Sequence, residues 1–284
     1  MSGAEIQALM ALLDDPDEGV YSHVRSRLLE QGDVILPILQ AERQDVTRCE
    51  TSVERLDELM SGMLERQALA GLRNWSASRP CAVMEGAFWI ESVCGFGQMK
   101  EEGQIAFAAL RRDVWLELNE ELTALEQIRV INHVMFTEYG FQRASLSEQG
   151  AAHAAPAQVL MERKGSPLGL GMIYMGLADS LGISLHPVSV SGLFFLAYVD
   201  PQWDASSEEV PRVWFYVNPF DGGQVVAPEE LSMIAQELET QWKPTLLDPL
   251  QVCFRLAEHL SRLCEESGHL AVAQRLTRLM EVLR

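Results

Sequence analysis

The chain has 284 residues, 48% of them hydrophobic and 22% charged, so it is long enough to bury a sizeable core as one large domain with appendages or as two domains. Its 22 lysines and arginines stand against 41 aspartates and glutamates, a formal net charge of -19. Because nucleic acids and anionic lipids bind mainly through cationic side chains, this charge argues against nucleic acid and membrane as partners. The first residues lack the features of a secretory signal, and the five cysteines contain no C-x-x-C pair. We therefore expect a reduced, cytoplasmic setting.

Apolar residues at helical spacing dominate residues 1–118. The stretch 14–40 combines an aspartate cap, an early proline and an apolar face, and it is similar to one HEAT-type repeat unit. A single copy leaves an ordinary helical bundle as the alternative. Residues 50–75 and 80–97 read as further helices, the second ended by glycines. We predict a helical N-terminal region over 1–118.

A capped helix is predicted for residues 121–141. Thr123 is placed as its N-cap and Glu126 as the third helical residue, the pattern of a capping box. Leu125 is expected on its apolar side, and His133, which falls among apolar positions, is expected to be a structural histidine.

After Gly182 the composition changes from helical to strand-like. Residues 186–200 and 212–220 are rich in Val, Phe, Tyr and Trp, which suit a pleated sheet. The connection between them carries Asp204, Glu208 and Glu209 and is predicted to be a solvated hairpin loop.

The C-terminal region, residues 241–284, is predicted to be a helical hairpin similar in length to a tetratricopeptide unit. Asp248 is its cap, Pro249 lies in the first turn and Gly268 breaks the hairpin. Cys253 and Cys264 share an apolar face and are expected in the core.

Four blocks carry a family resemblance: "LTALEQIRVINHVMFTEYGF", "VLMERKGSPLGLGMIYMGLADSLGI", "VSVSGLFFLAYVD" and "FYVNPFDGG". In this order they resemble the bacterial transglutaminase-like proteins of the SirB type, over about residues 10–284. The resemblance implies an α+β fold that is mostly helical, with a papain/transglutaminase-like core over 119–240 containing a small antiparallel sheet.

The superfamily's chemistry needs a cysteine at a helix N-terminus, a histidine on the next strand and an Asp or Asn on the strand after it. The resemblance places these positions at Pro167, Leu193 and Asn218. Proline is common at the first position in SirB-type relatives, whereas they tend to keep a His-Phe pair where this chain has Leu193 and Phe194. Neither proline nor leucine can exchange a proton, so the resemblance implies a degenerate triad with no catalytic residues.

Substitute catalytic groups are scarce in the sequence. Ser166 precedes the helix and fits an N-cap better than a nucleophile, because no base is placed beside it. His153 is interpreted as a surface histidine, with a working base as the less favoured alternative. His186 lies seven residues before Leu193, and along one strand this odd separation would place the two on opposite faces. No H-E-x-x-H pattern or phosphate-binding loop occurs, so no metal or cofactor is expected.

The leading functional hypothesis is a catalytically inactive protein that binds a protein or peptide in the cytoplasm, through an apolar groove where the triad was lost. The alternative is a hydrolase or amide transferase with a relocated site built from Ser166, His153 and Asn218. A third hypothesis is a structural scaffold whose terminal helices bind. The residues assigned to the groove are Ser166, Leu193, Phe194, Trp203, Trp214 and Asn218.

Overall fold

The computed structural model describes residues 3–43, 50–78, 81–95, 99–145, 147–190, 193–203, 211–238 and 245–284. The chain packs into two compact units, Met1–Ala70 and Gly71–Arg284. The boundary between the two falls inside one long helix, α4 (Glu50–Ala77). The family-based limits at residues 118 and 240 stay a prediction.

The first unit is a small helical assembly, as the apolar spacing predicted. Its elements before α4 are α1 (Gly3–Ala11), η1 (Leu12–Asp14), α2 (Glu18–Leu29), η2 (Gly32–Ile35) and α3 (Leu36–Arg43). Asp17 caps α2 by accepting hydrogen bonds from the backbone N–H groups of Gly19 and Val20. The core of the unit gathers Met10, Leu13, Tyr21, Val24, Leu28, Ile35, Leu39, Leu56, Leu59, Met60 and Met63.

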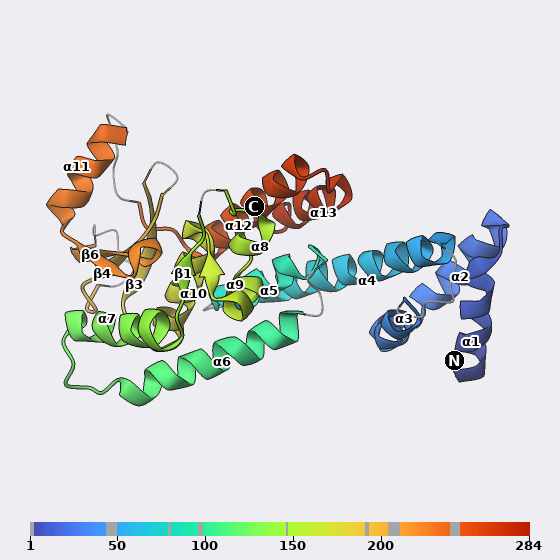
Figure 1. The fold of residues 1–284 in the computed structure, drawn as a ribbon, viewed down its shortest axis with the longest axis horizontal. Helices are drawn as coiled ribbons and strands as arrows, with labels where there is room; N and C mark the ends of the chain where they lie inside the picture. Colours follow the sequence, from blue (N-terminus) through green and yellow to red (C-terminus); the bar gives the residue numbers. More distant parts are fainter. Residues whose placement is uncertain are drawn as a thin grey trace. The chain divides into compact units, whose positions relative to one another are not determined.

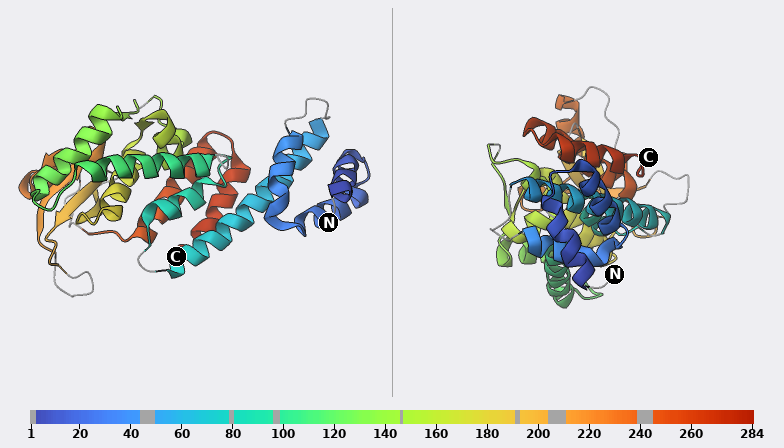
Figure 2. Two further views of the ribbon diagram at one scale, coloured as in Figure 1. Left: turned by 90° about the horizontal axis from the view of Figure 1, so that it is seen from below. Right: turned by 90° about the vertical axis from the view of Figure 1, so that its right-hand side faces the viewer.

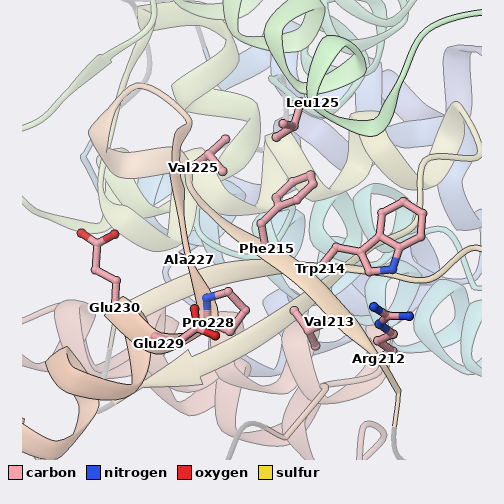
Figure 3. Close-up of a pocket in the computed structure, with 10 residues that line it drawn as sticks. All are labelled: Leu125, Arg212, Val213, Trp214, Phe215, Val225, Ala227, Pro228, Glu229 and Glu230. Atoms are coloured by element: carbon pink, nitrogen blue, oxygen red, sulfur yellow. The ribbon is translucent and has the colours of Figure 1, made fainter.

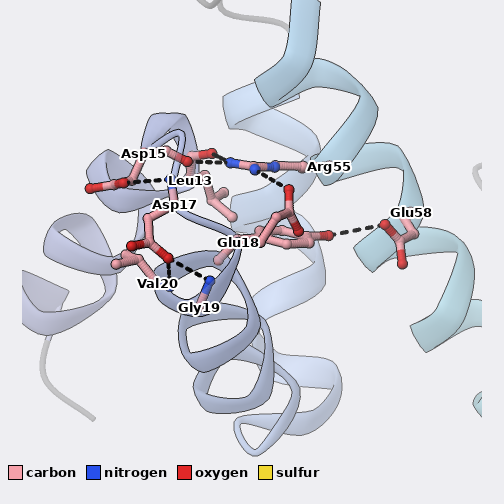
Figure 4. A network of polar contacts seen from close by, with 9 residues as sticks. Leu13, Asp15, Asp17, Glu18, Gly19, Val20, Arg55 and Glu58 are labelled. Carbon is pink, nitrogen blue, oxygen red and sulfur yellow. Dashed lines mark hydrogen bonds and ion pairs between the residues drawn. The ribbon is translucent and has the colours of Figure 1, made fainter.

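A nearly buried arginine joins α4 to the chain between η1 and α2 (Figure 4). The Arg55 guanidinium donates to the carbonyl oxygens of Leu13 (2.8 Å) and Asp15 (2.7 Å) and to the Glu18 carboxylate (2.9 Å). It also lies over the ring of Tyr21, 4.3 Å from the centroid. Arg55 thereby satisfies the carbonyls that the end of η1 leaves unpaired.

The second unit contains the remaining elements. Its helices and strands are α5 (Val83–Glu91), α6 (Met99–Glu117), α7 (Ala124–Asn132), the π-helix η3 (His133–Glu138), β1 (Gln142–Arg143), α8 (Ala151–Ala154), α9 (Pro156–Glu162), β2 (Lys164–Gly165), α10 (Pro167–Ser180), β3 (Leu185–Val190), β4 (Leu193–Val199), β5 (Val213–Asn218), η4 (Pro219–Asp221), β6 (Gln224–Val226), α11 (Pro228–Leu238), α12 (Pro249–Glu266) and α13 (Leu270–Met280). A mostly helical α+β fold with a small antiparallel sheet is therefore confirmed.

The main sheet is antiparallel with strand order β3-β4-β5-β6, and α10 packs against β3 and β4 (Figure 1). Interpreting residues 186–200 as one strand was wrong, because Val190 pairs with Leu193 and the segment folds back as the hairpin β3-β4. Asp204, Glu208 and Glu209 of the predicted loop lie outside the described residues.

Helix α10 forms the core of this unit, and every residue from Gly169 to Ala178 is buried. Glycine allows the sheet to approach it closely: a Cβ built on Gly171 would lie 2.2 Å from the Phe194 ring. At the C-terminus, α12 and α13 lie side by side (Figure 2), with Cys253 and Cys264 buried as predicted. No helix of the described residues is long and apolar enough to span a membrane.

The helix predicted for 121–141 forms with its capping box: Glu126 accepts from the Thr123 N–H at 2.8 Å. Two details of that prediction were wrong, because Leu125 is 44% exposed and His133 also lies at the surface. Ordinary α-helical spacing accounts for the second error, since His133 follows the buried Ile128 by five residues, about 140° around the helix. The π-helix begins only at His133. Tyr139 accordingly donates to the Val134 carbonyl, five residues back.

One carboxyl group is enclosed in the second unit. Glu91 is 2% exposed; its Oε2 accepts from the Ala157 N–H (2.9 Å), and its Oε1 has no hydrogen-bond partner among the described residues. Burial raises the pKa of Glu91 well above its ordinary value, and the Ala157 hydrogen bond only partly opposes the shift.

Replacing Arg55 by methionine should selectively destabilise the first unit. The two carbonyls would lose their donors, so we expect the free energy of unfolding to fall by about 2–4 kcal/mol. Hydrogen exchange of the α2 amides measures this loss. The exposed pair Arg27–Glu30 supplies the control: Arg27→Met should change exchange by no more than about 0.5 kcal/mol, and equal effects of the two substitutions would contradict the assigned role.

Glu91→Gln should change how stability depends on pH. The raised pKa means that the native state keeps its proton while the unfolded carboxyl ionises above its ordinary pKa of 4.5. The stability contributed by the protonated form is therefore full below that value and is lost as pH rises toward the folded pKa. Urea unfolding between pH 4 and pH 8 should show a shallower loss for Glu91→Gln than for the native protein. Glu85→Gln, on the exposed side of the same helix, should retain the native slope.

Candidate functional site

The first triad position begins the buried helix. Ser166 is the N-cap of α10, accepting from the Gly169 N–H at 3.2 Å, and Pro167 is the first helical residue. Ser166 is 2% exposed, and its own N–H donates to the His153 carbonyl at 2.7 Å. Among the described residues no hydrogen bond joins the His153 imidazole to the Ser166 hydroxyl. The serine is thus built into the helix start as a cap.

The second triad position lies on the wrong face of its strand to meet α10. Phe194 is the residue that rests on α10, at Gly171. Side chains alternate along a strand, so Leu193 shares the opposite face with Phe195 and Ala197 and is 40% exposed. The groove assignment of Leu193 beside Pro167 therefore lacks support from the sheet geometry.

The argument about His186 also changes with the hairpin. His186 pairs with Ala197, so it shares the face of Leu193, although the single-strand interpretation placed it on the other. Four residue steps along β4 still separate the two positions by about 13 Å. His186 instead meets Trp203 edge-on, with ring centroids 5.8 Å apart, and burial lowers the pKa of its imidazole.

The third triad position ends a strand, as Asn before Pro predicts. The side-chain oxygen of Asn218 accepts from the Phe220 N–H at 3.2 Å and opens the turn η4. Helix α10 contacts both β4 and η4, so the three segments of the triad are neighbours. A pocket of about 440 Å³ beside them is lined mainly by Phe136, Phe141, Leu170 and Phe220, and Arg143 and Asp221 pair at its rim.

A larger pocket, of about 980 Å³, lies on the side of the sheet where α7 packs (Figure 3). Four side chains form its apolar surface, which we call the aromatic platform: Leu125, Trp214, Phe215 and Val225. Phe215 is nearly buried, whereas Leu125, Trp214 and Val225 are 44%, 42% and 40% exposed. Arg212 lies beside Trp214, and Glu229 and Glu230 flank the start of α11 (Figure 3).

A β-bulge creates this platform. Tyr198 pairs with Phe215 and Val199 with Val213, so Trp214 is the extra residue. Trp214 and Phe215 consequently both stack on Tyr198, with centroids 5.5 Å and 4.9 Å away. Tyr198 donates to the Gln127 side chain on α7 at 3.2 Å, which fixes the stack against that helix.

Only part of the predicted groove is brought together. Trp214 lines the pocket, whereas Trp203 packs on the opposite face of the sheet, with the cluster that includes Val188 and Leu231. The sequence analysis missed Phe215, Val225 and Leu125, because a bulge does not show in a continuous apolar run such as "VWFYV". Trp203 was assigned to the groove because it borders the hairpin in the sequence, and that proximity does not decide which face of the sheet it packs on.

One group in the described chain has metal-ligand chemistry. Glu117, His133 and Glu138 bring one ligand atom each within 4.8 Å of one another. In an α-helix residues five apart are separated by about 140°, and the π-helix reduces that angle for His133 and Glu138. All three side chains are exposed, and exposed acidic groups of this kind are common without a bound ion.

Comparison with known proteins agrees with this geometry. A profile described as the transglutaminase-like superfamily matches residues 102–261. The UPF0162 protein of Vibrio cholerae serotype O1 is 28% identical over 140 residues, covering 49% of this chain and 48% of that protein. F-box only protein 21 of Homo sapiens and of Pongo abelii are each 22% identical over 181 residues, covering 63% of this chain.

The chain spans 28% of the length of those F-box proteins and about half of the Vibrio protein. No solved structure matches. Since the profile covers more than half of the residues, and a buried helix against an antiparallel sheet occupies that stretch, the chain belongs to the transglutaminase-like superfamily.

Proposed function

We propose that this protein is a catalytically inactive, SirB-type transglutaminase-like protein that binds another protein or peptide in the cytoplasm. The observation that carries the proposal is the aromatic platform, an exposed apolar surface in a chain whose triad positions hold Pro167, Leu193 and Asn218. Inactivity and binding rest on separate features of the structure.

The chemistry of the triad positions supports inactivity. Pro167 and Leu193 hold no ionisable group, and the Asn218 oxygen already accepts a hydrogen bond. Three of the free cysteines are poor candidates for a replacement nucleophile, because burial raises the pKa of the thiols of Cys94, Cys253 and Cys264. A nucleophilic thiolate is therefore disfavoured at each of them.

The composition of the platform supports binding. Exposed tryptophan beside aliphatic side chains is the usual anchor of a protein interface, since its burial releases much apolar surface without a large loss of side-chain entropy. Trp214 is held in place by stacking on Tyr198, so it is ordered before a partner arrives. The carboxylates of Glu229 and Glu230 would form a polar rim.

A selection of random peptides displayed on phage tests binding on the intact protein. We expect retained peptides to bind Trp214→Arg at least about tenfold more weakly, because the charge would be buried against the platform. Trp115→Arg is the matched control: Trp115 is 63% exposed on α6 and lies outside the pocket, so affinity should stay within about twofold. Circular dichroism checks that both variants fold.

The alternative enzyme is tested on the same preparation with serine-directed and thiol-directed active-site probes. The native protein should remain unlabelled. Stoichiometric labelling that Ser166→Ala abolishes would instead support the hydrolase or transferase built from Ser166, His153 and Asn218. Unchanged peptide affinity in Trp214→Arg would reject the binding role of the platform.

A further inference from the structure

The two edges of the main sheet differ in how they are protected. At the β3 edge, Pro187 has no N–H to offer, and its carbonyl accepts from the Leu247 N–H at 2.9 Å. Val188 beside it forms an antiparallel bridge with Leu246. The segment at Leu246 and Leu247 therefore covers the middle of this edge.

The opposite edge is incomplete. Strand β6 spans only Gln224–Val226 and pairs with Tyr216, Val217 and Asn218 of β5. The chain then turns away, because Pro228 begins α11. Val213 and Phe215 pair with β4 on one side, with Trp214 as the bulged residue between them, and among the described residues this segment has no strand partner on the other side.

The pocket occupies the space that β6 leaves. Arg212 and the first three residues of β5 form one wall, and the end of β6 with the first residues of α11 forms another. Four residues of an extended chain cover about 13 Å, so the open edge accommodates a short extended segment. Two of the side chains beside that segment would be Trp214 and Val225 of the platform (Figure 3).

The charges that line the pocket differ between its walls: Arg212 lies beside Trp214, whereas Glu229 and Glu230 lie at the start of α11 and favour a basic residue at that end of a partner. Glu229 and Glu230 are exposed, and neither forms an ion pair with any described residue. The chain as a whole carries a formal charge of -19, which attracts cationic segments from a distance. A lysine or arginine near the end of β6 would complement the two carboxylates.

We propose that the partner is an extended peptide segment that adds a strand to β5 at Val213–Phe215, with alternate apolar side chains on the aromatic platform and a basic residue facing Glu229 and Glu230. This inference rests on the proposed binding function. Backbone hydrogen bonds supply the pairing, and side chains on one face of the added strand supply the selectivity.

The peptides retained in the display selection provide the test. They should alternate apolar residues with others and include a lysine or arginine. In one retained peptide the backbone nitrogens are methylated one at a time. Methylation at every second residue should weaken binding at least about tenfold, and methylation at the residues between them much less, because only alternate amides face β5.

The protein variant Glu229→Gln/Glu230→Gln should weaken binding about threefold, more at low salt. Glu237→Gln, an exposed carboxylate further along α11, is the control.

The outcomes separate the two proposals. If methylation is tolerated equally at every position, or if retained peptides are acidic or have helical apolar spacing, strand addition is overturned while binding at the platform stands. If no retained peptide distinguishes the native protein from Trp214→Arg, the binding function fails and the strand model falls with it.

Discussion

The second unit depends on burying one helix completely. Helix α10 has no exposed face along most of its length, so its start must satisfy its own backbone and its sides must admit close neighbours. Ser166 and Pro167 meet the first requirement and Gly171 meets the second. In this chain Ser166 caps that helix start and Pro167 is its first residue.

The packing of β4 on α10 decides which side chains of the sheet reach the surface. Phe194 packs so closely on Gly171 that a Cβ there would lie 2.2 Å from its ring. Leu193 then lies on the other face of the sheet. A pocket of about 440 Å³ remains beside the start of α10, and the larger apolar surface lies farther along the sheet, at the bulge that displays Trp214.

Much of the fold follows from local chemistry that a sequence displays. The capping box at Thr123, the Asp248 cap and the proline at the start of α10 depend on neighbouring residues, so they were predicted before any tertiary contact was known. Two features escaped local reasoning. The bulge placed Trp214 and Phe215 on one face, and the β3-β4 hairpin reversed the face of His186, because strand pairing fixes which side chains share a face.

The sequence by itself determined the helical character, the acidic charge, the strand-rich segment after Gly182 and the presence of proline and leucine, which carry no ionisable group, at positions 167 and 193. These are properties of single residues and short periods. Only the tertiary structure decided which apolar side chains meet: it grouped Trp214 with Leu125 of another element and separated it from Trp203. Strand pairing and a one-residue bulge fix these side-chain contacts. Neither can be read from the order of apolar residues along one segment.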